Sequence, residues 1–278
     1  MKRGLRRLLP AVAAAVVFCS EMTATPQERL RADLSPELAA DFIDPRRAEK
    51  TATFAEGERL RFKLGWSLFT VARAELETIP GKHRGREALR IRLQARTNTF
   101  ADAFYKVRNL SVSWIRRDVS ASFLYAAQQS EGGDDRNTRA VFDPEELTAS
   151  YENLLKDEVR DPVAILPGTF DPLGIVFFVR ALDFEVGDRL VIPTSNGKEF
   201  FFTVVHVVDR VTRRFAFGKQ EAFVLEPDIK DLGGVFKRSP GGYLRFFFST
   251  DERKLPLRME SKVAVGRFWA ELTEIGEP

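Results

Sequence analysis

The chain has 278 residues, 44% of them hydrophobic, a length that allows one large domain or two small ones with a sizeable core. Residues 1–24 hold four of the 43 basic residues and one of the 40 acidic residues, which leaves 39 of each and places the whole formal charge of +3 in this segment. A body without net charge lacks the basic footprint of nucleic-acid binding, so we expect no nucleic-acid partner.

Residues 1–24 have the pattern of a bacterial export signal peptide. Four basic residues lie among the first seven, and a short apolar run follows from Leu8 to Phe18. We expect cleavage shortly after Ala24, export to the periplasm and no transmembrane span in the mature chain. The alternative is a lipid anchor on Cys19, the one cysteine of the sequence, although the bulky Phe18 before it disfavours acylation.

Residues 25–53 are predicted to be a linker or a short helix. Three prolines interrupt this polar stretch, which favours a mobile N-terminal segment. The alternative is a weak amphipathic helix that begins at Ser35 and Pro36 and continues through Phe42, since proline suits the first helical position.

Residues 54–278 are predicted to form a single β-rich domain. Apolar and polar residues alternate, with the period of a strand, in roughly ten segments. Those before the helix described next are 59–77, 89–95, 105–116, 122–129, 138–142 and 147–151. The first contains a bulge or tight turn between Gly65 and Thr70, and further turns are expected at 80–83 and 131–134.

One buried helix interrupts the strands. Asp171 is a plausible N-cap with Pro172 as the first helical residue, and the run from Leu173 to Leu182 is apolar on every side except at Arg180. A helix without a polar face must be buried, so we place it inside the curved sheet.

The strongest hairpin pattern lies between Arg189 and Val208. Asn196-Gly197 predicts a two-residue type I′ turn, and the run from Phe200 to Val208 is apolar on both faces, which indicates a central strand. A strand at 222–225, a glycine-rich loop at 232–240 and a three-stranded meander at 243–274 complete the chain. The fold is therefore mainly β: a large curved antiparallel sheet, an open or partly closed barrel, around one buried short helix.

Three separated motifs in residues 54–275 carry a resemblance to a known family. They are Phe54-Ala55-Glu56-Gly57-Glu58-Arg59-Leu60 with Trp66 following; Asp171-Pro172-Leu173 … Phe177-Phe178-Val179-Arg180 with Gly187 following; and Phe248-Ser249-Thr250-Asp251 … Leu255-Pro256 … Glu260-Ser261 … Gly266. They resemble the bacterial exported domain-of-unknown-function family 3108. The resemblance implies an envelope protein with a β-rich domain similar to the half-barrel of lipoprotein carriers, and it transfers no catalytic residue.

No catalytic constellation emerges from the residues themselves. His206 is predicted to be a packed core histidine, and Asp171 a helix cap. Asp251 and Glu260 are predicted to be a turn former and a surface salt-bridge partner, not an acid–base pair. We therefore expect no enzyme, no cofactor and no metal site, and a hydrolase is the least supported class.

Two functions follow from these patterns. The 24 phenylalanines against four tyrosines favour a non-enzymatic envelope protein that binds a lipid or other amphiphile in an apolar cavity. The candidate cavity residues are Trp66, Phe177, Phe178 and Phe202. The alternative is a filled-core interaction or scaffold domain that binds an envelope protein or a glycan.

Two rows of basic residues form a candidate anionic-ligand patch, for lipid or polysaccharide. The rows are Arg61 with Lys63 and Arg90 with Arg92. The alternative is the solvated face of a sheet.

Overall fold

The structure is a computed structural model that describes residues 30, 34–48, 57–228, 242–263 and 266–276. The expected leader and the glycine-rich loop at 232–240 lie outside the described residues.

In the described part of the chain, fourteen strands form one antiparallel sheet, which confirms the predicted fold class. The strands are β1 (Arg59–Trp66), β2 (Phe69–His83), β3 (Arg86–Thr97), β4 (Val107–Arg116), β5 (Ser122–Glu131), β6 (Asp134–Asp143), β7 (Thr148–Asn153), β8 (Glu158–Ala164), β9 (Arg189–Ser195), β10 (Phe200–Phe215), β11 (Gly218–Pro227), β12 (Tyr243–Ser249), β13 (Pro256–Val263) and β14 (Gly266–Gly276).

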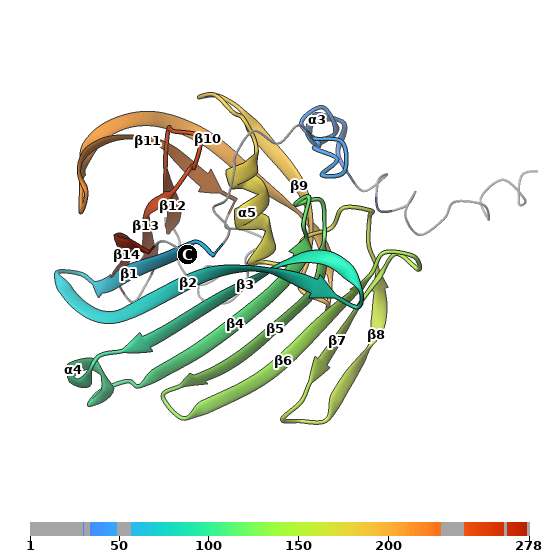
Figure 1. Cartoon of the computed structure of the whole chain (residues 1–278), viewed down its shortest axis with the longest axis horizontal. Helices are drawn as coiled ribbons and strands as arrows, with labels where there is room; N and C mark the ends of the chain where they lie inside the picture. The colour runs from blue at the N-terminus through green and yellow to red at the C-terminus, as the bar shows by residue number, and fades with distance from the viewer. Residues whose placement is uncertain (1–29, 31–33, 49–56, 229–241, 264–265, 277–278) are drawn as a thin grey trace, which may run out of the picture.

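The sheet is open, and its first and last strands pair with each other in the middle. Its order is β8-β7-β6-β5-β4-β3-β2-β1-β14-β13-β12-β11-β10-β9, so β1 pairs with β14 while β8 and β9 are the edges. Strands β1 to β8 spread as a broad wing, and β9 to β12 arch over it (Figure 1). The predicted C-terminal meander is confirmed as β12, β13 and β14.

The β2–β3 hairpin corrects one predicted turn. Strand β2 continues through residues 80–83 to His83, which pairs with Arg86. The two residues between them, Arg84 and Gly85, have φ angles of 48° and 80°. Positive φ at both central positions is the requirement of a type I′ turn, so this geometry occurs here and not at Asn196-Gly197.

The β9–β10 hairpin forms, but through a longer loop than predicted. Ser195 pairs with Phe200, which leaves residues 196–199 in the loop. Gly197 has a φ of 84°, whereas that of Asn196 is not positive. The Asn196 side-chain oxygen accepts hydrogen bonds from the Lys198 and Glu199 amides at 2.9 and 3.1 Å, an Asx-type turn that replaces the type I′ geometry.

Strand β10 is less central than its composition indicated. It is the second strand from the β9 edge of the sheet. Val204 and Val205 are both buried, as expected for a strand covered on two faces, but Val208 is 43% exposed. The apolar pattern therefore overstated the burial of the last residue of the predicted strand.

Two short helices flank the sheet. The first is α3 (Pro36–Ala39), which begins where the alternative helix was expected but ends before Phe42; the Ser35 hydroxyl accepts from the Leu38 amide. The chain then joins β9, because the Ile43 amide donates to the Val191 carbonyl at 3.0 Å. The second is α4 (Thr99–Asp102), which connects β3 to β4 and was not predicted from the sequence.

The buried helix is α5 (Gly174–Ala181), between the wing and the arch (Figure 1). All of its residues except Val176 are buried. They share one core cluster with Leu60 and Ile91 of the wing and with Leu225 and Phe247 of the arch. The helix therefore fills the concave side of the sheet, as its apolar composition predicted.

Candidate functional site

Asp171 binds the backbone at the start of α5 and joins the helix to the wing, but the helix begins at Gly174 with Leu173 as its N-cap, and not at Pro172 as predicted. One of its carboxylate oxygens accepts from the Leu173 and Gly174 amides at 2.8 and 2.9 Å. The other accepts from the hydroxyls of Ser113 and Ser122 at 2.5 and 2.6 Å. Complete burial raises the pKa of this carboxyl, while these four hydrogen bonds lower it. The group is thus structural and has no access to a substrate.

Arg180 forms a buried ion pair that the sequence analysis did not predict. Its guanidinium donates to both oxygens of Glu58 at 2.9 and 3.1 Å, and neither side chain is more than 1% exposed. It also donates to the backbone carbonyls of Lys254 and Arg253 at 3.1 and 3.2 Å. The available signal was one charge on an otherwise apolar helix, which had to find a partner if the helix was buried.

The four aromatic residues assigned to a cavity are not brought together. Phe177 and Phe178 of α5 have no exposed surface, so neither ring borders a space that a water molecule can enter. Trp66, at the end of β1, is 47% exposed. Phe202 lies on β10, and four strands of the sheet separate β10 from β1. Phe177 and Phe178 belong instead to the core cluster that packs around α5.

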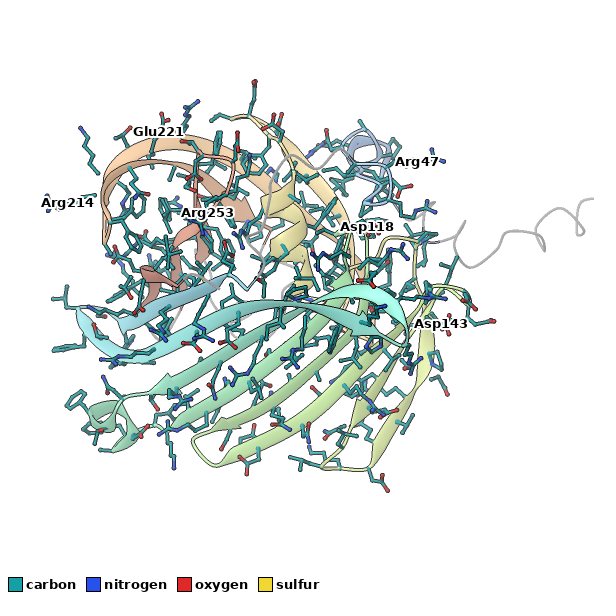
Figure 2. The ribbon with its side chains drawn as sticks, viewed as in Figure 1. Arg47, Asp118, Asp143, Arg214, Glu221 and Arg253 are labelled. Carbon is teal, nitrogen blue, oxygen red and sulfur yellow. The ribbon has the colours of Figure 1, made fainter. Side chains whose placement is uncertain are left out.

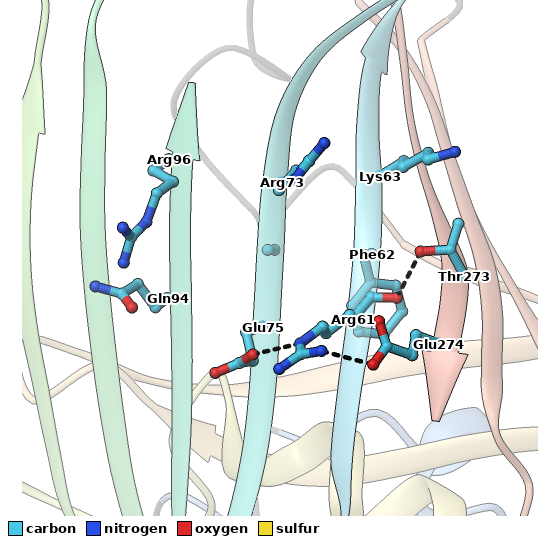
Figure 3. A pocket seen from close by; sticks show the side chains of 10 residues that line it. Arg61, Phe62, Lys63, Arg73, Glu75, Gln94, Arg96, Thr273 and Glu274 are labelled. Atoms are coloured by element: carbon cyan, nitrogen blue, oxygen red, sulfur yellow. Dashed lines mark hydrogen bonds and ion pairs between the residues drawn. The ribbon is translucent and has the colours of Figure 1, made fainter. Parts of the chain in front are cut away.

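A polar hollow lies instead on the outer face of the wing, which we define as the face opposite α5 (Figure 3). It has a volume of about 420 Å³ and spans β14, β1, β2 and β3. At its centre, Arg61 donates to Glu75 at 2.7 Å and to Glu274 at 2.6 Å. Glu75 holds the pKa of Arg61 above its usual value, first through this hydrogen bond.

Three basic residues of this hollow lie directly opposite one another on neighbouring strands. Lys63 of β1 pairs in register with Arg73 of β2, and Arg73 pairs with Arg96 of β3. All three are exposed. Like charges in direct cross-strand positions destabilise a sheet. The described residues place no carboxylate within salt-bridge distance of Lys63, Arg73 or Arg96, so these charges are available to an anion. We call these three residues the cationic row.

The hollow continues along the outer face towards β5. A second hollow, of about 340 Å³, shares Gln94 and Arg96 with the first and extends to Arg108, Leu110 and Gln128. Arg108 of β4 is the cross-strand partner of Arg96, but its guanidinium already forms an ion pair with Asp102 at 2.6 Å.

The predicted basic patch is only partly available. Lys63 belongs to the cationic row, whereas Arg61 is held by two glutamates. Arg92 donates to Glu77 at 3.1 Å, and the Arg90 guanidinium lies 5.7 Å from the Trp114 ring centre. Arg73 and Arg96 were not predicted, because the basic rows were read along single strands and only the pairing of β2 with β3 brings these two residues together.

The remaining candidates are surface or turn residues. His206 is not in the core: its side chain is 39% exposed and lies 3.3 Å from Asp228. Asp251 accepts from the Ser249 hydroxyl within the β12–β13 turn, and Glu260 binds Arg258 and Arg213, so both match their predicted roles. Among the described residues, no group of histidine, cysteine and carboxylate side chains has the arrangement of a metal site. Within the same residues, no helix is long and apolar enough to cross a bilayer.

Comparison with known proteins gives a family. The model of the family described as protein of unknown function (DUF3108) matches residues 61–273. No curated protein matches the chain in sequence. A β-barrel-like protein of domain of unknown function DUF1849 from Brucella abortus is similar in structure, with 9% identity, a TM-score of 0.49, and coverage of 80% of this chain and 98% of that one. The hypothetical protein CT021 from Chlamydia trachomatis has 12% identity and a TM-score of 0.34 over 80% of this chain and 87% of that one.

Proposed function

The chain belongs to the DUF3108 family, and from this premise we propose that it is a non-enzymatic interaction domain that binds an anionic glycan of the cell envelope along the cationic row. The observation that carries the proposal is the direct opposition of Lys63, Arg73 and Arg96 on three neighbouring strands. Such an arrangement is unfavourable without a counter-charge, and a bound polyanion supplies one.

The shape of the outer face favours a polymer over a small anion. The two connected hollows cross six strands from β14 to β5. At a spacing of about 4.8 Å between strands, they extend over roughly 24 Å. The row runs perpendicular to the strands, so an extended chain with repeated carboxylate or phosphate groups can contact the three cations in succession.

Titration with dextran sulfate, against uncharged dextran of equal length, tests this proposal. Binding of the charged polymer alone is expected. The double variant Arg73→Gln with Arg96→Gln is expected to lose about tenfold in affinity, if each guanidinium contributes about 0.7 kcal/mol. Arg214, which is exposed on the β10–β11 arch and not on the wing (Figure 2), provides the matched control Arg214→Gln. Equal affinity of the double variant and the parent would refute the assignment.

The second candidate function is the binding of a lipid or other amphiphile under α5. The observation in its favour is the open sheet, because β8 and β9 are edges and α5 can leave the concave side without breaking a strand ladder. Displacement of α5 would have to separate Arg180 from Glu58 and open the space beside Phe177 and Phe178. Binding of an apolar probe dye by the parent protein would support this function, whereas the absence of dye binding would support a filled core.

We further propose that the protein is exported to the periplasm, on the pattern of residues 1–24. A mature chain that begins shortly after Ala24 is expected in the intact mass of the protein recovered from its host. A mass that retains Cys19 with acyl chains would establish the lipid-anchored alternative instead.

A further inference from the structure

Exposed apolar side chains gather at one end of the wing. Leu68 in the β1–β2 turn is 93% exposed, and Phe69 beside it is 65% exposed. Phe104, after α4, is 79% exposed, and Phe100 and Phe268 are exposed as well. The β1–β2 turn and α4 lie at the same end of the wing (Figure 1). We call Trp66, Leu68, Phe69, Phe100, Phe104 and Phe268 the apolar rim.

Hydrogen bonds join the three loops that carry the rim. The Ser67 amide donates to the Arg267 carbonyl at 2.8 Å, which ties the β1–β2 turn to β14. The Asn98 amide and side chain donate to the Val71 and Thr70 carbonyls, both at 2.9 Å, which ties α4 to β2. The rim is therefore one surface built from adjacent loops.

A bidentate ion pair fixes the loop that carries two of the rim phenylalanines. Arg108 donates to the two carboxylate oxygens of Asp102 at 2.6 and 3.0 Å. The aromatic side chains of Phe100 and Phe104 pack edge to face, with ring centres 5.6 Å apart, and stay exposed. The ion pair therefore holds the loop in a conformation in which both phenylalanine side chains remain exposed to solvent.

Basic residues accompany the apolar tips. Lys106 follows Phe104 by two positions, and Arg267 precedes Phe268. Lys262 and Arg267 lie directly opposite each other on β13 and β14, a second like-charge pair, and both are exposed. Across the three segments 63–73, 96–108 and 262–269, the sequence has seven basic residues and one acidic residue, Asp102, which Arg108 occupies.

We propose that the apolar rim docks the protein on a bilayer that contains anionic phospholipid. In interfacial binding, apolar side chains enter the boundary between headgroups and acyl chains, while nearby lysine and arginine side chains contact anionic headgroups. Tips on separate loops at one end of a sheet suit a planar surface. A protein partner fits less well, because protein interfaces are depleted in lysine and the rim has lysines next to its apolar tips.

This inference goes beyond glycan binding, and the two functions respond differently to substitutions in the rim. The rim variant Leu68→Ser with Phe69→Ser leaves the cationic row intact, so its affinity for dextran sulfate is expected to equal that of the parent. The row variant Arg73→Gln with Arg96→Gln leaves the rim intact. Its vesicle binding is expected to fall by about fivefold for each basic residue that reaches the headgroups.

Co-sedimentation with vesicles tests the docking surface. The full chain is used throughout, so any membrane affinity of residues 1–24 is common to all variants. The parent and the control Phe217→Ser, an exposed phenylalanine of the β10–β11 turn outside the rim, are expected to bind vesicles that contain phosphatidylglycerol. The rim variant is expected to bind them at least about tenfold more weakly, with a native circular-dichroism spectrum.

The outcomes are distinct. A single variant on a different loop, Phe104→Ser, is expected to reduce vesicle binding in the same direction, which guards against a folding defect in the double variant. Undiminished binding by both rim variants would overturn the proposal and leave the rim as a protein contact. Equal binding of the parent to phosphatidylcholine vesicles would overturn the requirement for anionic lipid.

Discussion

Replacing Arg180 tests whether the buried ion pair holds α5 in the sheet. Arg180→Met keeps the apolar stem but removes four hydrogen bonds, two to Glu58 and two to backbone carbonyls. The Glu58 carboxylate, which is only 1% exposed, then remains as a buried charge, and its nearest remaining cation is Arg253 at 3.4 Å. Breaking a buried pair on one side costs about 3–5 kcal/mol, and Arg253 places the expected loss near the lower value.

The partner substitution is expected to be milder. Glu58→Gln keeps the shape and one oxygen acceptor, and Arg180 keeps both backbone carbonyls. The expected loss is about 1–3 kcal/mol, the usual penalty of an imperfectly satisfied buried group. Because the double variant contains no unpaired buried charge, its loss should be smaller than the sum of the two single losses.

Urea unfolding of the four proteins measures these differences in free energy. A domain with a total stability of about 5–15 kcal/mol should show the Arg180→Met loss as a clear shift of the midpoint. The reasoning fails if Arg180→Met unfolds at the parental midpoint. It also fails if the two single losses add within about 0.5 kcal/mol, since that is the behaviour of independent sites.

Three further predictions concern stability. Phe177→Ala and Phe178→Ala should each lose about 3–5 kcal/mol in chemical denaturation without probe-dye binding by the parent, because both rings are fully buried; a much smaller loss at one of them would favour the amphiphile function. Gly197→Val should lose about 1–3 kcal/mol, because its φ is 84° and a Cβ would lie 2.7 Å from that of Ala140; an unchanged midpoint would contradict this. Hydrogen bonds from Arg108 and Thr97 lower the pKa of Asp102 from 3.8 to about 2. The carboxylate therefore stabilises the fold fully at a pH above 3.8, and this stabilisation is lost as the pH falls to about 2. Asp102→Asn should therefore reduce the acid-induced fall of the urea midpoint over this range, and an unaltered acid dependence would exclude the pair as its source.

The sequence predicted the fold well because its strongest signals are local and redundant. Alternation of apolar and polar residues over a long segment indicates a strand with one buried face. An apolar run such as Leu173–Leu182 indicates an element that is buried on all sides. Turn geometry was less predictable. Asn196-Gly197 has the composition of a type I′ turn, but the Asn196 side chain binds the Lys198 and Glu199 amides and lengthens the loop. A side-chain hydrogen bond of this kind has no periodic signature.

The candidate site could not be predicted because it depends on register. Arg73 and Arg96 are 23 positions apart, and only the pairing of β2 with β3 places them side by side. A shift of one residue would turn one of them towards α5. Alternation along one strand gives the facing of each residue but not its partner on the next strand, so it cannot recover the row.

The three motifs that resemble the family meet in space, and where they meet explains why they do not reveal the function. Glu58 comes from the first motif, Arg180 from the second, and the carbonyls of Arg253 and Lys254 from the turn within the third. Together these groups form one buried polar cluster, here called the joint, which fixes α5 to the sheet and has a structural role. The cationic row and the apolar rim lie almost entirely outside these motifs, on strands and loops that the joint supports. Substitutions in the joint should therefore lower stability first, whereas substitutions such as Arg73→Gln or Phe69→Ser should weaken binding without a loss of stability.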